Sequence, residues 1–516
     1  MPNSLLPGVA VLAVLTTTMS PQDRMQLTIL HTNDIHGHID SWRGWDSDLA
    51  GRTLGGFDRL ATAVERARSE SQNVLLLDAG DAIGDTLVAA STQGKAVIDL
   101  MNEVRYDAMT LGNHEPDFGM DVLRQRIHEA RFDVIAANVV ESGSKQLFAK
   151  PYVLRSVGGV KVGILGIAYP NTPLTTAKKN VAGYEFRHAR ETAAEYVPKV
   201  RAEGAELVIV LSHLGLSADR KLAEAVPNID VIVGGHSHNR MKQLLRTGHT
   251  VIVQSGAHLS DLGRLDLSIE SGKVTAARST LITLDNAAVT SNRAIARKME
   301  QYRTAAGEAD VAIADAPIVR AQTLAGSEPG RRDQESPADS LFADILREHA
   351  RAEIAFLPGV GYGVAMPAGP IRKSTLKNLV PHESKLVAMT LTGTDIKDIL
   401  EQSVENVLSE DPQKKLGGMV QVSGLTFTYQ PQQKYGSRVQ TVLVGGKPLD
   451  PRQQYRTVTN SMLADGGHNY RALTRGSDRR ELEPQYDIIE GALRKRGRIT
   501  TPERGRIRGP RYDEQD

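Results

Sequence analysis

The chain has 516 residues, 62 basic and 61 acidic side chains, and no cysteine. Its length predicts two to four domains, and its balanced charge gives no global field that would attract nucleic acid or an anionic membrane. Without cysteine there are no disulfides, thiolate metal sites or cysteine nucleophile, so any metal ion must be held by His together with carboxylate or amide oxygens.

An apolar run, Leu5–Leu15, lies near the start of the chain. It is too short to span a bilayer as a helix but has the length of the apolar core of a signal peptide. We interpret residues 1–24 as a signal peptide and expect a periplasmic or secreted protein. A disordered N-terminus is the alternative, because no Lys or Arg precedes the run and no Ala-x-Ala cleavage site follows it. No other stretch is long and apolar enough to predict a membrane span.

Residues 25–285 alternate short apolar strands with helical segments, which predicts a layered α/β domain. The strands are expected at Leu27–His31, Val74–Leu77, Ala108–Leu111, Val134–Ala137, Val162–Ile167, Leu207–Leu211, Val231–Val233, Val251–Val253 and Leu265–Ile269. The helices are expected at Gly56–Ser69, Lys95–Val104, Asp121–Ala130, Ala189–Glu203 and Ser217–Ala225.

A second domain, mixed α and β, is predicted over residues 311–495, after a connecting helix within 286–310. Its helices are expected at Asp339–Arg351 and Gly393–Val407, and its strands at Gly424–Tyr429, Val439–Val444 and Arg456–Thr459. Residues Ala321–Gln334 are predicted to form a loop, and residues 496–516 a solvated tail.

Polar side chains that can bind metal follow five of the strands predicted in the first domain. Sites in open α/β sheets collect at the carboxyl ends of strands. One such residue after a strand is ordinary, but five strand ends carrying ligand types in one domain predict a shared site. The residues are Asp34 and His36, Asp81, Asn113, His213, and His236 and His238.

Two carboxylates, one amide and four imidazoles are too many ligands for one tetrahedral ion. They suit two divalent ions that share a bridging carboxylate. Nitrogen and oxygen ligands without sulfur favour Mn, Zn, Fe, Co or Ni over Mg or Ca. Two ions roughly 3.5–4 Å apart can clamp the attacking and leaving oxygens of an in-line displacement and supply hydroxide at neutral pH.

His114 directly follows Asn113, and adjacent side chains on an extended chain diverge. We therefore expect His114 to face the substrate rather than share the ion. Asp117, three residues later, is placed to hydrogen-bond the imidazole, which is typical of a leaving-group acid or transition-state stabiliser. The alternative is that Asp117 caps a helix over Met120–Ala130.

The order of these blocks resembles the calcineurin-like metallophosphoesterases and, within them, the 5'-nucleotidase family. The blocks are His31-Thr32-Asn33-Asp34-Ile35-His36, Asp78-Ala79-Gly80-Asp81, Gly112-Asn113-His114-Glu115, Ser212-His213 and Gly235-His236-Ser237-His238.

The resemblance implies a four-layer αββα domain, a C-terminal domain that supplies the substrate pocket, and an active site between them. It implies Asp34, His36, Asp81 and His238 around one metal, and Asp81, Asn113, His213 and His236 around the other. It further implies that His114 and Asp117 form the catalytic dyad, and that the activity is hydrolysis of phosphate monoesters of nucleotides or similar small phosphoesters.

The C-terminal half departs from the nucleotidase pattern. The region of the family's substrate-binding Arg reads Leu357-Pro358-Gly359-Val360-Gly361-Tyr362-Gly363, without Arg. Met419 and Met462 stand where the family places two aromatic rings around the base, and His468 where it has an acidic partner of the ribose. These three are the substrate-contact candidates.

Two alternatives to a nucleotidase remain open. The C-terminal half also resembles the thiosulfohydrolase branch of the superfamily, which hydrolyses a sulfate group from a carrier-bound thiosulfonate with two manganese ions. Arg372, Lys373, Lys377 and His382 are candidates to bind the anion of either substrate. A non-enzymatic binding protein is the third class. His31, His38, His128, His188, His249 and His258 are predicted to be structural or exposed, with His31 and His38 as candidate supports of the ligands.

Overall fold

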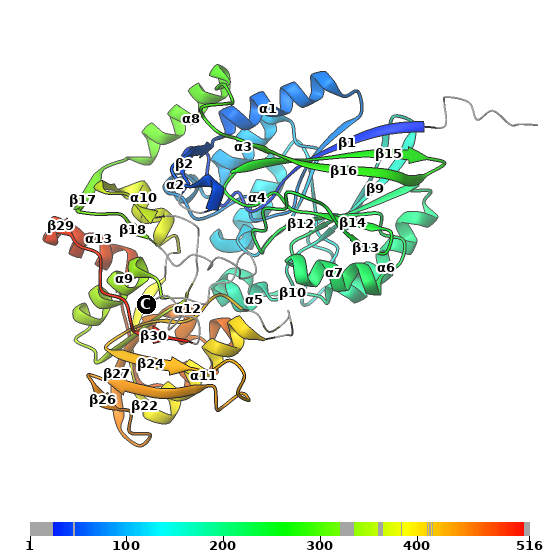
Figure 1. Ribbon diagram of the computed structural model, residues 1–516. Helices are drawn as coiled ribbons and strands as arrows, with labels where there is room; N and C mark the ends of the chain where they lie inside the picture. Colours follow the sequence, from blue (N-terminus) through cyan, green and yellow to red (C-terminus); the bar gives the residue numbers. More distant parts are fainter. Residues whose placement is uncertain are drawn as a thin grey trace, which may run out of the picture.

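The structure is a computed structural model, and it describes residues 24–44, 47–319, 335–359, 365–382, 384–409, 411, 414 and 416–509 (Figure 1). The predicted signal peptide, the predicted loop at Ala321–Gln334 and the stretch from Val360 to Gly363 lie outside the described residues. None of the helices in the described ranges is both long enough and apolar enough to cross a membrane.

Two six-stranded sheets form the N-terminal domain. In the first, the strand order is β16 (Lys273–Thr283), β15 (Asp261–Glu270), β1 (Arg24–Thr32), β4 (Val74–Asp78), β5 (Ala108–Thr110) and β6 (Asp133–Ile135). In the second it is β13 (Leu245–Thr247), β14 (Thr250–Val253), β12 (Val231–Gly234), β11 (Leu207–Ser212), β9 (Val160–Ile167) and β8 (Tyr152–Val157). The strands that precede the predicted ligands are parallel within each sheet, so their carboxyl ends share one edge.

The two sheets pack face to face, and helices cover their outer faces. Leu27 and Ile29 of β1 share one buried cluster with Ile209 and Leu211 of β11. On the outer faces lie α1 (Phe57–Glu70), α3 (Lys95–Val104) and α4 (Met120–Glu129) over the first sheet, and α6 (Ala189–Ala202) and α7 (Leu216–Ala225) over the second. The implied four-layer αββα architecture is confirmed, and burial of both faces explains the near-continuous apolar strands.

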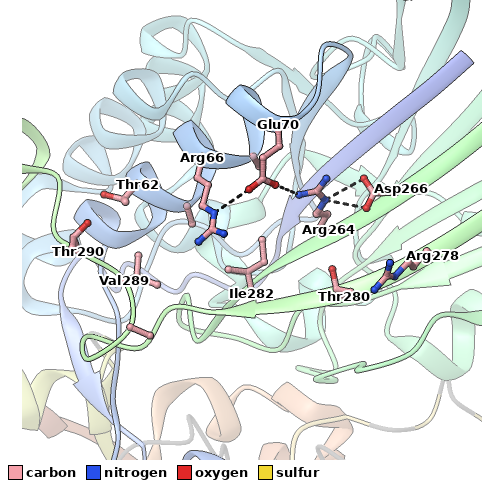
Figure 2. A pocket seen from close by; sticks show the side chains of 13 residues that line it. Thr62, Arg66, Glu70, Arg264, Asp266, Arg278, Thr280, Ile282, Val289 and Thr290 are labelled. Atoms are coloured by element: carbon pink, nitrogen blue, oxygen red, sulfur yellow. Dashed lines mark hydrogen bonds and ion pairs between the residues drawn. The ribbon is translucent and has the colours of Figure 1, made fainter.

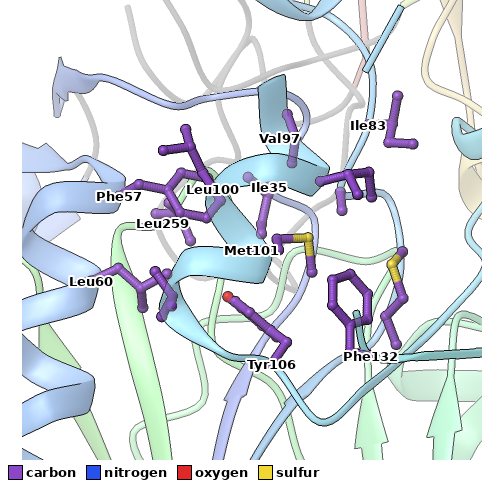
Figure 3. Close-up of a cluster of buried hydrophobic side chains, with 14 of the residues drawn as sticks. Ile35, Phe57, Leu60, Ile83, Val97, Leu100, Met101, Tyr106, Phe132 and Leu259 are labelled. Atoms are coloured by element: carbon purple, nitrogen blue, oxygen red, sulfur yellow. The ribbon is translucent and has the colours of Figure 1, made fainter. Parts of the chain in front are cut away.

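A cluster of apolar side chains anchors the loops that follow β1 and β4 (Figure 3). Ile35 and Ile83 are 0 % and 1 % exposed and belong to the same cluster as Phe57 and Met101. Ile35 stands between Asp34 and His36 in the chain. Its burial in the cluster turns the two flanking polar side chains away from the core and fixes the loop that carries them.

In the C-terminal domain, the central sheet has the order β23 (Gln421–Ser423), β19 (Ile354–Leu357), β27 (Gln454–Asn460), β22 (Lys385–Thr392) and β28 (Ser477–Pro484). The helices α9 (Pro337–His349) and α13 (Gln485–Arg496) pack on one face, and α11 (Gly393–Leu408) on the other. A smaller sheet, β26 (Lys447–Pro448), β25 (Val439–Val444), β24 (Leu425–Tyr429) and β30 (Ile507–Arg508), lies beside α11. The helix α8 (Arg293–Ala306) joins the two domains.

All of the strands and helices predicted above are found, with ends shifted by up to four residues. Several strands were not predicted, including the mostly buried strands β19 and β22 of the C-terminal domain. The edge strands β8 and β16 were also missed. Most residues of β8 and β16 are exposed or half-buried, so these two strands lack the apolar alternation that marks a strand.

The segment assigned to a solvated tail differs from the prediction up to residue 509. The strand β29 (Arg498–Ile499) pairs with β17 (Asp310–Ala314), and β30 pairs with β24. Arg506 forms an ion pair with Asp344, with an Nη2–Oδ2 distance of 2.8 Å. The basic residues that read as a solvated extension therefore find partners on the domain surface.

Candidate functional site

Asp34 and His36 lie in the loop after β1, and backbone hydrogen bonds join this loop to the loop after β4. The backbone N–H of Asp34 donates to Gly80 O at 2.9 Å, and that of His36 donates to Asp81 O at 2.8 Å. The sequence analysis assumed an extended chain, but the φ angles are 52° for Asp34 and 50° for His36. The two side chains therefore converge through a tight loop and not through strand alternation.

Five of the seven predicted ligands adopt this left-handed backbone conformation. Asp81, His236 and His238 have φ angles of 56°, 73° and 55°. For residues other than Gly such a conformation costs on the order of 1 kcal/mol each, and it persists where the surroundings and a function require it. The loops at this edge of the sheets are therefore shaped to aim these side chains at one point.

Three of the ligands meet on one side of the site. The Nε2 atom of His238 is 3.3 Å from Asp34 Oδ1 and 3.1 Å from His36 Nε2. His36 Nε2 lies 3.7 Å from Asp34 Oδ1 and 3.8 Å from Asp81 Oδ2. One ligand atom from each of Asp34, His36 and His238 lies within 4.8 Å of the others, which is compatible with a common ion.

The other ligands meet on the far side of Asp81. His213 Nε2 is 3.0 Å from Asp81 Oδ2, and ligand atoms of Asp81, His213 and His236 lie within 4.8 Å of one another. Asn113 Oδ1 is buried and makes no hydrogen bond to any residue that the structure describes. Burying an amide oxygen without a hydrogen-bond donor costs free energy unless a cation binds it. The residues present therefore fit divalent metal, with Asp81 between the two groups of predicted ligands.

A hydrogen bond at His213 and an ion-pair contact at His36 fix which nitrogen of each ring faces the site. His213 Nδ1 donates to Ala79 O at 2.7 Å. His36 Nδ1 lies 2.7 Å from Asp85 Oδ2, and a carboxylate can only accept. Both rings therefore present Nε2 to the metal position, as supporting partners of metal-binding histidines do.

The charges of the site compensate one another without metal. Burial alone lowers the pKa of His213, but Asp81 and Asp34 raise it to about 9. Burial raises the pKa of Asp81, but the imidazoles of His213 and His114 hold it well below its usual range. Metal must displace protons from such imidazoles, so metal affinity is expected to rise with pH.

Asp85 is a supporting residue that the sequence analysis missed. It is 5 % exposed and has a φ angle of 54°, so its side chain is held in place against backbone strain. Its position four residues after Asp81 was the only signal in the sequence.

The Asp85→Asn variant is expected to bind divalent metal roughly 10- to 100-fold more weakly, because His36 loses the carboxylate that orients its ring and raises its basicity. Calorimetric titration of Mn²⁺ into metal-free protein measures the change. Asp121→Asn, on the exposed face of α4, is the matched control. Equal affinity of the Asp85→Asn variant and the wild type would remove Asp85 from the site.

His114 and Asp117 form a hydrogen-bonded pair beside the metal position. His114 Nδ1 is 2.7 Å from Asp117 Oδ2, and Thr176 Oγ1 donates to Asp117 Oδ1 at 2.9 Å. Asp117 lies in a short 3-10 helix, Glu115–Phe118, while α4 begins after Gly119 without a side-chain cap. The structure therefore favours the partner role of Asp117 over the helix cap. Burial lowers the pKa of His114, but Asp117 and Asp81 raise it to about 10.

Glu115 organises the loop that carries Asp81. Its carboxylate accepts the backbone N–H groups of Asp81 at 2.9 Å and of Ala82 at 2.7 Å. It also accepts the N–H of Gly112 at 2.5 Å, which ties together the loops after β4 and β5. Glu115 stood in the quoted Gly-Asn-His-Glu block, but its role depends on backbone donors that sequence cannot reveal.

The three substrate candidates are placed unequally. Met419 is completely buried, and its sulfur accepts a hydrogen bond from Ser403 Oγ at 3.1 Å. His468 is 3 % exposed. Only Met462 is partly exposed. In this arrangement Met419 offers no face to a flat base, because it is packed into the C-terminal core, and His468 is buried as well.

His31 is buried beside the site but is not a ligand. Among the described residues, neither ring nitrogen has a hydrogen-bond partner, and the ring packs against Gly263 so tightly that a Cβ there would lie 2.1 Å from it. Burial lowers the pKa of His31 to about 3. The two rings of His38 and His258 pack together nearby, with centroids 4.2 Å apart.

The His31→Phe variant is expected to lose part of the acid sensitivity of folding. Below pH 6.5 the unfolded chain binds a proton at His31, whereas the folded protein does not bind it until the pH falls to about 3. This residue therefore lowers the free energy of unfolding by about 1.4 kcal/mol for each pH unit between those limits. Urea unfolding of metal-free protein at pH 7 and pH 5 measures the difference, and parallel pH curves for the two proteins would contradict it.

A cavity of about 630 Å³ lies away from the metal ligands, between α1 and the β15–β16 hairpin (Figure 2). Arg66 and Arg264 bind Glu70 at 3.0 and 2.7 Å, and Arg264 also binds Asp266 at 3.0 Å. These charged side chains form ion pairs with one another and hold the hairpin against α1, so this cavity is not the candidate active site.

Two family models match the chain. The calcineurin-like phosphoesterase model matches residues 27–240, and the 5'-nucleotidase C-terminal domain model matches residues 312–475. The two matches correspond to the two halves described above.

Similar proteins span the whole chain. The trifunctional nucleotide phosphoesterase YfkN of Bacillus subtilis is 30 % identical over 95 % of this chain, which spans only 35 % of that protein's length. The snake venom 5'-nucleotidase of Naja atra is 27 % identical, with 93 % of this chain and 98 % of that protein covered.

Solved structures also resemble this chain over most of its length. The 5'-nucleotidase precursor of Thermus thermophilus superposes with a TM-score of 0.85 at 28 % identity, covering 94 % of this chain and 99 % of that one. The sulfate thiohydrolase SoxB of Thermus thermophilus has a TM-score of 0.81 at 23 % identity, covering 94 % and 96 %. The second likeness shows the fold alone.

Proposed function

This chain belongs to the calcineurin-like metallophosphoesterases that carry a 5'-nucleotidase C-terminal domain, and we propose that it hydrolyses phosphate monoesters of nucleotides or similar small phosphoesters. The observation that carries this proposal is the convergence of six side chains that could hold metal next to a His–Asp pair. The family uses divalent metal, and we propose two ions, drawn from Mn, Zn, Co or Fe.

A pair of divalent ions, when bound, supplies positive charge that polarises the phosphoryl oxygens and an activated water. The chain's own residues would hold the ions and orient the reacting groups. His114 presents its Nε2 edge beside the metal position, because its Nδ1 is committed to Asp117. From there it can stabilise charge on the leaving oxygen or donate a proton to it, and Asp117 keeps the imidazolium form available.

The substrate is proposed from the relatives and from the site together. The named functions of the Naja atra and Thermus thermophilus proteins favour a nucleotide. Methionines at the two ring positions, with Met419 completely buried, favour a substrate whose recognition does not depend on stacking between two rings. A small phosphoester outside the nucleotides therefore remains within the proposal. The apolar run Leu5–Leu15 supports export of the protein to the periplasm or medium.

A substrate panel tests the proposal. Manganese-loaded protein is assayed for phosphate release from AMP, 2',3'-cyclic nucleotides and 4-nitrophenyl phosphate, and for sulfate release from a thiosulfonate. We expect phosphate release that a chelator abolishes and Mn²⁺ restores. Sulfate release without phosphate release would establish the thiosulfohydrolase alternative, and no release from any substrate would leave a binding protein.

A further inference from the structure

One residue of the C-terminal domain reaches the His114–Asp117 pair. His382 lies between α10 (Lys373–Leu379) and β22, after Pro381. Its ring is parallel to that of His114, with an interplanar angle of 1° and centroids 5.1 Å apart. Its Nδ1 is 3.4 Å from Asp117 Oδ2, the same oxygen that His114 Nδ1 approaches at 2.7 Å. One carboxylate oxygen therefore faces two imidazoles from different domains.

The segment that carries His382 is fixed at both ends. Leu379 and Val380 are 1 % and 5 % exposed in the C-terminal core. After the loop, Ser384 O accepts a hydrogen bond from the backbone N–H of Gln485 at 2.9 Å. The position of His382 is therefore set by the C-terminal domain and not by the loop alone.

His382 also stands at a side of the site that is open to solvent. The side chains of Asp34, His36 and His213 are 0 to 2 % exposed, whereas those of His114, Asp117 and His382 are 10, 13 and 26 % exposed. The side chain of the predicted ligand His238 is 17 % exposed, so the opening is not confined to these three residues. A leaving group that remains outside the predicted metal ligands can lie against His114 and His382 on this side.

We propose that His382 is a positioning residue for the catalytic pair: its ring packs on His114, and its Nδ1–H holds the Asp117 carboxylate that orients His114. The proposal rests on the hydrolase function proposed above. Thr176 holds the other oxygen of Asp117 at 2.9 Å, so with His382 in place the carboxylate is restrained on both oxygens. A displacement of a catalytic group by about 1 Å can cost roughly 100-fold in rate, so such restraint affects turnover.

The expected effect depends on the leaving group. A residue that positions the group acting on the leaving oxygen matters most when that oxygen is a poor leaving group. We expect His382→Ala and His382→Phe to lower kcat on an alkyl phosphate by about 10-fold, with KM nearly unchanged. The loss on 4-nitrophenyl phosphate, whose leaving group needs little protonation, is expected to be at most about twofold. His382→Gln, which keeps an N–H donor, is expected to recover most of the loss, whereas His382→Phe keeps only the ring.

A double-mutant cycle separates this role from general damage. Because His382 acts through His114, the His114→Ala, His382→Ala double variant is expected to be no slower than His114→Ala alone. Additive losses, equal losses on both substrates, or a change confined to KM would each overturn the proposal.

A measurement that does not depend on activity separates this test from the test of the hydrolase function. In a crystal structure of the His382→Ala variant, we expect the His114 ring to lose its single orientation while Asp34, His36 and Asp81 stay in place. An unchanged His114 would overturn the proposal even if no substrate has been found. An inactive wild type with a displaced His114 in the variant would instead refute the proposed function alone.

Discussion

Replacement of Asp81 by Asn is expected to remove metal binding and to lower kcat/KM by at least about 1,000-fold. Asp81 Oδ2 approaches His213 on one side at 3.0 Å and His36 on the other at 3.8 Å. The side chain is nearly inaccessible, so no other carboxylate can take its place. Asn keeps the shape but loses the charge, and the imidazoles are left without the anion that balances them.

Metal content by mass spectrometry, together with phosphate release, measures the effect of Asp81→Asn. Asp78→Asn is a matched control, because Asp78 is equally buried three residues earlier but accepts a hydrogen bond from Thr32 at 2.6 Å instead of facing the ligands. Burial raises the pKa of Asp78 well above its usual value, so its change to an amide removes less negative charge than the change at Asp81 does. Full metal occupancy in the Asp81→Asn protein would show that Asp81 does not bridge two ions.

Replacement of His114 by Ala is expected to lower kcat by about 100- to 10,000-fold while metal content stays that of the wild type. The reason is that His114 faces the open side of the site with Asp117 on its Nδ1, and its ring is not required to complete either ligand group. The loss should be larger for an alkyl phosphate than for 4-nitrophenyl phosphate. Asp117→Asn, which leaves the ring but not the charge that holds its pKa near 10, should fall between the wild type and His114→Ala.

Two results would contradict this role of His114. A loss of metal in parallel with activity would make His114 a ligand, which its proximity to His36 and Asp81 allows geometrically. A loss of equal size on both substrates would mean that His114 does not act on the leaving oxygen. Either outcome can be read from the same two measurements, metal content and the ratio of the two rates.

Much of the fold could be predicted because the residue patterns that indicate it lie close together in the sequence. Apolar runs such as Leu207–Leu211 predict strands that are buried on both faces, and the polar residues that follow them fall at one edge of the sheets. The order of the five motifs predicted the family, since each motif places a ligand type directly after a strand. The edge strands β8 and β16 escaped prediction because a half-exposed strand needs no apolar pattern.

The sequence by itself predicted the candidate ligands, their division between oxygen and nitrogen donors, and the class of reaction. Only the tertiary structure decided how those ligands converge, because left-handed loops and not strand alternation bring Asp34 and His36 together. It also decided the partners that lie outside the motifs, namely Asp85 on His36 and His382 on Asp117. Such partners come from loops and from the second domain, and their approach depends on how whole sheets and domains pack, which no local pattern of residues encodes.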